Sequence, residues 1–232
     1  MKRKPAMVCV ALVILSAAAG CSAAQNSAAP AGSNQEDLEF SSEETDEEDA
    51  VDAFAAEDIL NFVFEGEEYT IPFPYEQLQA SGWTVAPDMD EIYGEGEDRV
   101  LLFMEHPDYE EILMTVSSKT MSAGIKDTES LVCELEENGV WGLGVSLESM
   151  DLLSDTSLYP EFVIRGVGFG SSAADVLAAF GDGYSSSFSS PEDGIYVYDV
   201  QEKMGEDMVD YHLEICLEDD QVASLDILVY YY

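Results

Sequence analysis

Hydrophobic and polar residues alternate along the C-terminal part of the chain, which predicts β-strands at residues 195–200, 209–218 and 222–231. In the second of these strands one face carries Tyr211, Leu213, Ile215 and Leu217, and the other carries His212, Glu214, Cys216 and Glu218. In the third strand, Ala223, Leu225, Ile227 and Val229 alternate with Ser224, Asp226, Leu228 and Tyr230. We expect antiparallel strands with one buried and one solvated face, joined by a turn that contains Asp219 and Asp220.

A short helix at residues 172–180 precedes these strands. Ser172 is a suitable N-cap, Asp175 follows it at capping-box spacing, and Gly181 can adopt the left-handed conformation that ends a helix. The apolar face of this helix consists of Val176, Leu177 and Phe180. A helix of about two and a half turns is marginal alone, so we expect it to pack on the sheet.

The part of the chain before residue 150 gives a similar order of elements with weaker alternation. The pattern predicts strands at residues 61–65, 68–73, 99–105, 111–117, 131–136 and 140–146. Pro74 opens a short helix at residues 75–81. Asn138-Gly139 separates the last two strands, and Asn-Gly is a strong signal for a hairpin turn.

These elements place the folded part of the chain in the α+β class, with two short helices packed on antiparallel sheets. A lead strand, a short helix ending in glycine and a set of antiparallel strands occur twice. We therefore predict two degenerate repeats, a first helix-on-sheet unit at residues 59–150 and a second at residues 151–232.

The N-terminus has the layout of a signal peptide over residues 1–20: a basic start, then an apolar run too short for a confident membrane span. The segment Ala18-Ala19-Gly20-Cys21 resembles the lipobox of bacterial lipoproteins, except that leucine is more usual at the place of Ala18. The resemblance implies that Cys21 receives a diacylglycerol and anchors the mature protein to the membrane. The alternative is an ordinary secreted protein, cleaved after Ala17-Ala18-Ala19.

Residues 21–58 are expected to form a disordered acidic tether. From Glu36 to Asp58 the chain has twelve acidic residues and no basic one, so it cannot bury enough apolar surface to fold. The whole chain follows the same trend, with 49 Asp and Glu against 8 Lys and Arg, a formal net charge of −41. Such a charge repels phosphate, which argues against nucleic acid as a partner.

The sequence contains no recognisable catalytic, nucleotide-binding or metal-binding motif, so we expect no cofactor and no metal site. His106 and His212 are the two histidines, and neither has a motif around it. Cys133 and Cys216 lie beyond the signal and the proposed lipid site, in a compartment that permits a disulfide. Their neighbours differ in polarity, so a bridge and two free thiols both remain open.

Two pairs of tyrosines are the candidates for a binding surface. Tyr196 and Tyr198 share one face of a predicted strand, and Tyr230 and Tyr232 share another. Tyrosine is favoured at recognition surfaces because it offers area and a hydrogen bond at low entropic cost. The alternative is that one member of each pair completes the core.

The segment from Gly170 to Gly181, with an aromatic strand and two alternating strands behind it, resembles the repeat unit of the β-lactamase-inhibitor-protein-like fold. The match covers the second unit well and the first only weakly, and Gly183 stands where that family often has proline. The resemblance implies two units in tandem and protein binding on the open sheet face, and it carries over no catalytic residue. Uncharacterised lipoproteins of Gram-positive bacteria are among the proteins that share this pattern.

These observations together predict a lipid-anchored extracytoplasmic protein. Its expected role is to bind another envelope or secreted protein without catalysis. The alternatives are an envelope hydrolase that uses carboxylates and a protein that binds divalent cations.

Overall fold

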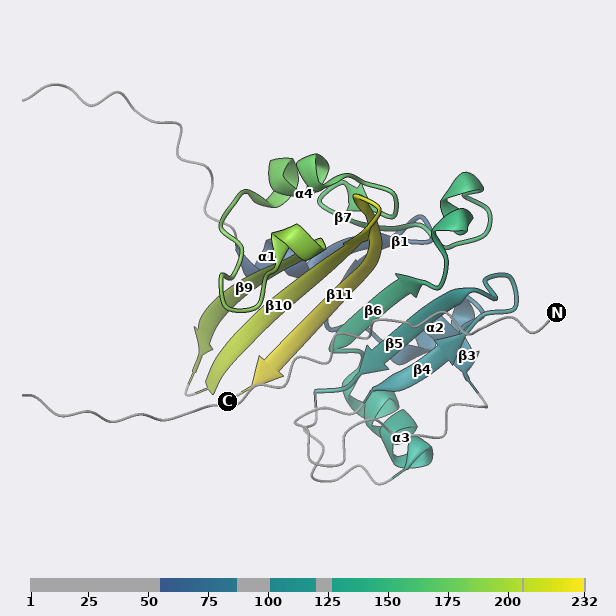
Figure 1. Cartoon of the computed structure of the whole chain (residues 1–232). Helices are drawn as coiled ribbons and strands as arrows, with labels where there is room; N and C mark the ends of the chain where they lie inside the picture. The colour runs from purple at the N-terminus through teal and green to yellow at the C-terminus, as the bar shows by residue number, and fades with distance from the viewer. Residues whose placement is uncertain (1–54, 87–100, 120–126, 206, 232) are drawn as a thin grey trace, which may run out of the picture. The chain divides into compact units, whose positions relative to one another are not determined.

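The computed structural model describes residues 55–86, 101–119, 127–205 and 207–231 (Figure 1). The described α-helices are α1 (Ala56–Leu60), α2 (Tyr75–Ala80), α3 (Thr128–Asn138) and α4 (Ala173–Phe180), and the 3₁₀ helices are η2 (Met150–Ser154) and η3 (Pro191–Asp193). None of the helices in these ranges has the length and apolar character needed to span a bilayer. The predicted signal peptide, Cys21 and most of the predicted tether lie outside the described residues.

A seven-stranded antiparallel sheet, which we call the large sheet, is the main element of the fold. Its strand order is β3-β4-β5-β6-β11-β10-β9. The strands are β3 (Thr84–Val85), β4 (Leu102–Glu105), β5 (Ile112–Ser117), β6 (Gly142–Leu147), β9 (Ile195–Met204), β10 (Asp207–Glu218) and β11 (Gln221–Tyr231). The predicted α+β class is confirmed.

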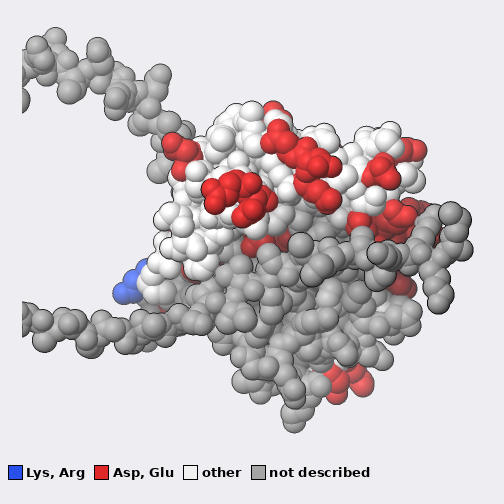
Figure 2. Space-filling model, in the orientation of Figure 1, with Lys and Arg blue, Asp and Glu red and all other residues white. Residues whose placement is uncertain are grey.

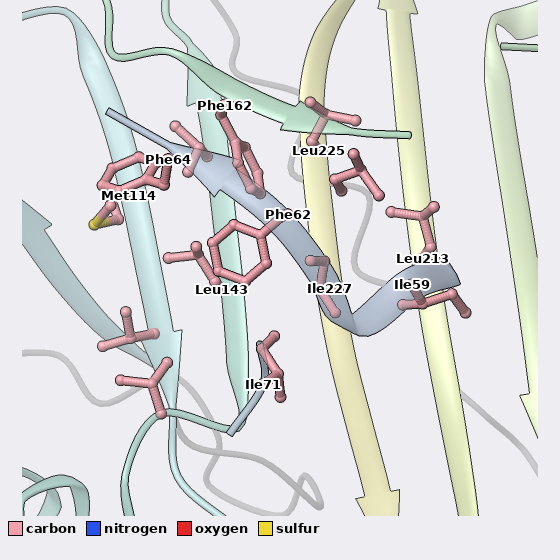
Figure 3. Packing of buried hydrophobic residues seen from close by; sticks show 14 of the residues in the cluster. Ile59, Phe62, Phe64, Ile71, Met114, Leu143, Phe162, Leu213, Leu225 and Ile227 are labelled. Atoms are coloured by element: carbon pink, nitrogen blue, oxygen red, sulfur yellow. The ribbon is translucent and has the colours of Figure 1, made fainter. Parts of the chain in front are cut away.

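A second antiparallel sheet of four short strands has the order β2-β1-β7-β8. Its strands are β1 (Asn61–Phe64), β2 (Glu67–Thr70), β7 (Phe162–Ile164) and β8 (Val167–Gly168). This small sheet crosses one face of the large sheet, and the rings of Phe62, Phe64 and Phe162 fill the space between the two layers (Figure 3). The ion pair between Arg165 and Asp58, at 2.9 Å, ties the turn after β7 to α1.

The face of the large sheet towards the small sheet is the buried face. Its side chains include Met104, Met114, Val116, Leu143, Val145, Leu213, Ile215, Leu225 and Ile227. Helices cover the rest of this face: the Tyr75 hydroxyl of α2 contacts the Met104 sulfur, and Phe180 of α4 packs on Tyr198 with ring centroids 5.1 Å apart. Because burying each large apolar side chain contributes about 1.5–3 kcal/mol, this layer is the main source of stability.

The two halves of the described chain share part of their order of elements. Each has two short strands of the small sheet, then a helix (α2 or α4), then three adjacent strands of the large sheet (β4–β6 or β9–β11), but the first half adds β3 after α2 and α3 between β5 and β6. The halves meet where β6 pairs with β11 and where β1 pairs with β7, so each sheet contains strands from both. They are parts of one structural unit and share one core.

Three predictions about elements need correction. Residues 131–136 belong to α3 and form no strand, because Asp127 and Ser130 form a capping box and Gly139 ends the helix. The tether ends earlier than residue 58, since Ala56 and Ile59 of α1 are buried. On α4 the capping by Ser172 and Asp175 is as predicted, but Leu177 is 38% exposed and does not join the apolar face.

Candidate functional site

The candidate site lies on the face of the large sheet opposite the buried face, which we call the polar face. Alternation along β9, β10 and β11 places on it the side chains of Asp199, Gln201, Asp210, His212, Glu214, Cys216, Ser224, Asp226, Leu228 and Tyr230. Figure 1 shows α1 and β1 behind these strands, so the polar face is turned towards the reader. Figure 2, in the same orientation, shows acidic groups in separate patches, mostly in the upper part of this side, and basic groups near one edge.

Strand register brings two acidic residues together at the centre of the polar face. Glu214 of β10 lies directly opposite Asp226 of β11, and Asp226 lies directly opposite Gly144 of β6. Residues that face each other across an antiparallel pair have Cβ atoms about 4.5–5.5 Å apart, and like charges in this position are destabilising. We call Glu214 and Asp226 the carboxylate pair.

Gly144 makes room for the Asp226 carboxyl group. A Cβ atom at residue 144 would collide with Asp226 Oδ1, and it would lie 2.6 Å from Thr115 Oγ1. A side chain on β6 would therefore push both groups away. This explains a glycine in the middle of a central strand, where it otherwise weakens the sheet.

Two serines support Asp226 from the neighbouring row of the sheet. The Ser224 hydroxyl donates to Asp226 Oδ2 at 2.7 Å, and the hydroxyls of Ser224 and Ser146 are 2.7 Å apart. Burial raises the pKa of Asp226 to about 7, against the lowering effect of the Ser224 hydrogen bond, and the Glu214 charge raises it further. Near neutral pH the Asp226 carboxyl group is therefore present in both its protonated and its ionised form.

His212 links the carboxylate pair to β9. Its Nδ1–H donates to Asp199 Oδ1 at 2.6 Å, and its Nε2 lies 3.9 Å from Glu214 Oε2. Burial alone lowers the pKa of His212, but the hydrogen bond to Asp199 and the nearby Glu214 carboxylate outweigh burial and raise that pKa to about 9. At neutral pH His212 is therefore an imidazolium ion. The rings of Phe188 and Tyr230 pack against it in T-shaped contacts, with centroids 6.5 and 6.3 Å from that of His212.

Two further groups complete the polar face. The Cys216 thiol donates to Glu214 Oε1 at 3.4 Å, and burial raises the pKa of this thiol. Asp210 Oδ2 accepts a hydrogen bond from Gln201 at 3.3 Å, whereas Asp210 Oδ1 is buried without a hydrogen-bond partner among the described residues. Burial also raises the pKa of Asp210. A buried acceptor without a donor is uncommon and costs stability.

The basic residues of the described chain form no salt bridge with these acids. Arg165 pairs with Asp58, and the Lys119 ammonium lies over the rings of Trp141 and Tyr231, at 5.2 and 4.2 Å from their centroids. Lys203 is on the polar side of β9 but stands at the exposed tip of the β9–β10 hairpin. Within the described ranges, no group of three or more His, Cys, Asp or Glu side chains is arranged to hold a metal ion.

The prediction that Tyr196 and Tyr198 form an exposed binding pair is wrong. They are 5% and 1% exposed and point into the buried face, opposite Ile215 and Leu213. The Tyr198 hydroxyl donates to the Gly181 carbonyl at 3.0 Å, and burial raises its pKa to about 12. Of the other pair, Tyr230 lies half-buried on the polar face and Tyr232 lies outside the described residues.

The cysteines left open by the sequence are both free thiols. Cys133 is exposed on α3, while Cys216 is half-buried on the polar face of β10. The sequence pattern places His212, Glu214 and Asp226 on the solvated faces of their strands, but not next to one another. That proximity depends on the β9–β10 and β10–β11 registers, and on Gly144 in a third strand.

Comparisons with protein-family models, with curated proteins and with solved structures found no match to this chain. The family resemblance expected from the sequence therefore stays a prediction.

Proposed function

We propose that this protein is a lipid-anchored extracytoplasmic binding module that captures another envelope or secreted protein on its polar face. The lipobox-like segment at Cys21 supports the anchor, and the acidic run after it suits a spacer between membrane and folded unit. The large excess of acidic residues favours a partner with a basic surface.

The contrast between the two faces of the large sheet carries this proposal. The buried face is covered by the small sheet and by helices, as the contacts of Tyr75 and Phe180 show. The polar face presents four carboxyl groups and one imidazolium ion along β9–β11, bordered by Leu228 and Tyr230. Charged groups on such a face attract and orient a partner of opposite charge, and tyrosine, as at Tyr230, is a residue type enriched at protein interfaces.

Site-specific photo-crosslinking in the full-length protein tests this proposal. A photoreactive phenylalanine analogue at Leu228 places the probe on the polar face without removing a carboxyl group. The matched control carries the same analogue at Leu177, which is exposed on α4. In the producing cells we expect one discrete crosslinked protein from position 228 and at least fivefold less of it from position 177.

Equal crosslinking from both positions, or none from position 228, would contradict binding through the polar face. Growth at higher salt should reduce the yield from position 228, because charge attraction contributes to capture.

A carboxylate-dependent envelope hydrolase is the second candidate, favoured by one observation. The pKa of Asp226 near 7, next to Glu214, is suited to a general acid beside an ionised carboxylate. An open cavity of about 310 Å³ lies elsewhere, and its lining includes the exposed Glu76, Glu136 and Glu137. Turnover of envelope glycans that is lost in Asp226→Asn but kept in Asp219→Asn would favour the hydrolase.

A further inference from the structure

The large sheet ends on one side in β9, whose outer edge is the longest among the described strands. β9 pairs with β10 along its whole length, and no other described strand lies on its outer side (Figure 1). The other edge strands of the two sheets are much shorter: β3 and β8 have two residues each and β2 has four, whereas β9 has ten. Short edge strands protect a sheet from pairing with another chain, so β9 needs a different form of cover.

The loop before β9 covers only the first part of this edge. The Ser185 N–H donates to the Val197 carbonyl at 2.7 Å, and the Val197 N–H donates to Ser189 Oγ at 2.9 Å. Ser190 and Ile195 form an isolated antiparallel bridge just before these contacts. The outward backbone groups of β9 are therefore satisfied as far as Val197.

The later part of the edge is open. Backbone groups of alternate residues in a strand point to the same edge, so those of Asp199, Gln201 and Lys203 point outward like those of Val197. The N–H and C=O groups of these three residues have no backbone hydrogen-bond partner within the described chain. Their side chains lie on the polar side of β9, and those of Gln201 and Lys203 are exposed. We call residues 199–203 the free edge.

The charges along the free edge are complementary to those of a second, antiparallel copy of the same edge. When Gln201 lies opposite Gln201 of the second copy, Asp199 lies opposite Lys203 of the second copy, and the same pair repeats at the other end. Opposite charges that face each other across two strands stabilise the pairing. Lysine at an edge often prevents pairing, but in this register it meets an acid.

Both members of this charge pair are available for it. Lys203 has no salt bridge and no ring contact within the described ranges, unlike Arg165 and Lys119. Asp199 uses Oδ1 for its hydrogen bond with His212, which leaves Oδ2 for a lysine.

We propose that two copies of this protein pair through the free edge, with antiparallel β9 strands and Gln201 on the two-fold axis. Facing residues with outward backbone groups exchange both of their N–H···O bonds, which gives about six hydrogen bonds in all. β9 ends at Met204, so each strand ends where the loop at residues 185–190 begins to cover the edge of the other copy. The two large sheets become one continuous sheet with both polar faces on the same side. This inference goes beyond the proposed function and does not depend on it.

A free edge of five residues forms a short interface, so the dimer should be weak and reversible. Contacts that bury less than about 1,200 Å² are typical of transient complexes. The net charge of −41 also opposes association, although salt near 0.15 M screens exposed charges beyond about 8 Å. Met204, which is 54% exposed at the end of β9, offers apolar surface to the second copy. A covalent trap is therefore the appropriate measurement.

Disulfide trapping of the full-length protein in the producing cells tests the proposal. All samples carry Cys133→Ser, which removes the exposed thiol of α3, and then either Gln201→Cys or Lys203→Cys. These two positions share one strand and one face. In the proposed register the two copies of position 201 face each other, within the Cα separation of about 7 Å that a disulfide allows, whereas the two copies of position 203 are more than about 13 Å apart.

After mild oxidation we expect at least about fivefold more disulfide-linked dimer from Gln201→Cys than from Lys203→Cys. Adding Lys203→Glu to Gln201→Cys places a like charge opposite Asp199 and should lower the dimer yield about fivefold. The matched control is Lys119→Glu, which changes the net charge equally but lies just after β5, in the other half of the large sheet. It should change the yield by less than about twofold.

Equal yields from positions 201 and 203 would overturn the proposal, because random collision would then account for the link. A complete lack of dimer from position 201 would overturn it as well, and so would equal effects of Lys203→Glu and Lys119→Glu. A link from position 201 to a different protein in place of a second copy would also contradict pairing of the free edge with itself. Photo-crosslinking from position 228 tests the polar face separately, so each proposal can fail without the other.

Discussion

At the scale of single residues, the environment of Asp226 sets the chemistry of the polar face. Its carboxyl group lies over Gly144, accepts a hydrogen bond from Ser224 and faces Glu214. Burial and the facing carboxylate both oppose its ionisation. A residue kept close to a like charge in this way weakens the free protein near neutral pH.

Replacing Asp226 with asparagine should stabilise the folded protein at high pH. The folded pKa of about 7 is raised above the value near 3.8 for an unperturbed aspartate, so wild-type stability falls as pH rises from 4 to 7 and then levels off. At pH 8 we expect Asp226→Asn to unfold with a free energy on the order of 2 to 4 kcal/mol above the wild type, and at pH 4 the gap should be nearly zero. Urea denaturation of the full-length variants at both pH values measures it.

Asp219→Asn serves as the control for this measurement and should match the wild type at both pH values. A gap for Asp226→Asn that is equally large at pH 4 and pH 8 would mean that lost packing or hydrogen bonding, and not titration, governs the difference.

Tyr196, Tyr198 and Asp226 show what the sequence can and cannot predict for individual residues. The alternation of apolar and polar residues in β10 and β11 correctly predicts which side chains face solvent, so Asp226 was predictable as a residue of the solvated face. The face of β9 was not predictable, since Tyr196, Val197 and Tyr198 are all buried. The β10–β11 register also contains a bulge at Cys216/Leu217, which the two-residue turn alone does not reveal.

At the scale of elements, α3 and α4 follow the same plan. Each begins with a capping box, Asp127 with Ser130 in α3 and Ser172 with Asp175 in α4, and each ends at a glycine with positive φ. The sequence pattern predicts this plan only for α4. In α3 the Asn-Gly dipeptide marks the end of a helix and not a hairpin turn. The preference of Asn-Gly for hairpins was outweighed by the helix caps and by the burial of Leu131 and Leu135.

The two terminal glycines allow a matched test of close packing. Gly139 and Gly181 have nearly the same backbone conformation, with φ of 80° and 75°. A Cβ atom at Gly139 would lie 2.8 Å from the Phe73 carbonyl oxygen, whereas one at Gly181 would meet nothing within 4 Å. Gly181→Ala should therefore cost about 1 to 2 kcal/mol from backbone strain alone, and Gly139→Ala should cost at least about 1 kcal/mol more. Equal losses in urea denaturation would show that the Phe73 segment moves aside freely.

At the scale of the whole molecule, long-range pairing decides where the site is. Ser146 and Ser224 are hydrogen-bonded although they are 78 residues apart in the chain, and this β6–β11 contact joins the two halves in one sheet. The composition and the alternation of single strands predicted the α+β class with antiparallel strands. They could not predict which strands meet at the centre, and therefore not that Gly144 would accommodate Asp226.

The most direct measurement of the central claim is crosslinking from position 228 in the full-length protein, with Asp226 or Asp219 changed to asparagine in the same chain. If the polar face captures a partner with a basic surface, the crosslinked band should fall about fivefold or more with Asp226→Asn and stay nearly unchanged with Asp219→Asn. The crosslinked peptide recovered from the partner should contain lysine or arginine next to the attachment point. A band of unchanged strength in Asp226→Asn, or a crosslinked peptide without basic residues, would contradict the claim.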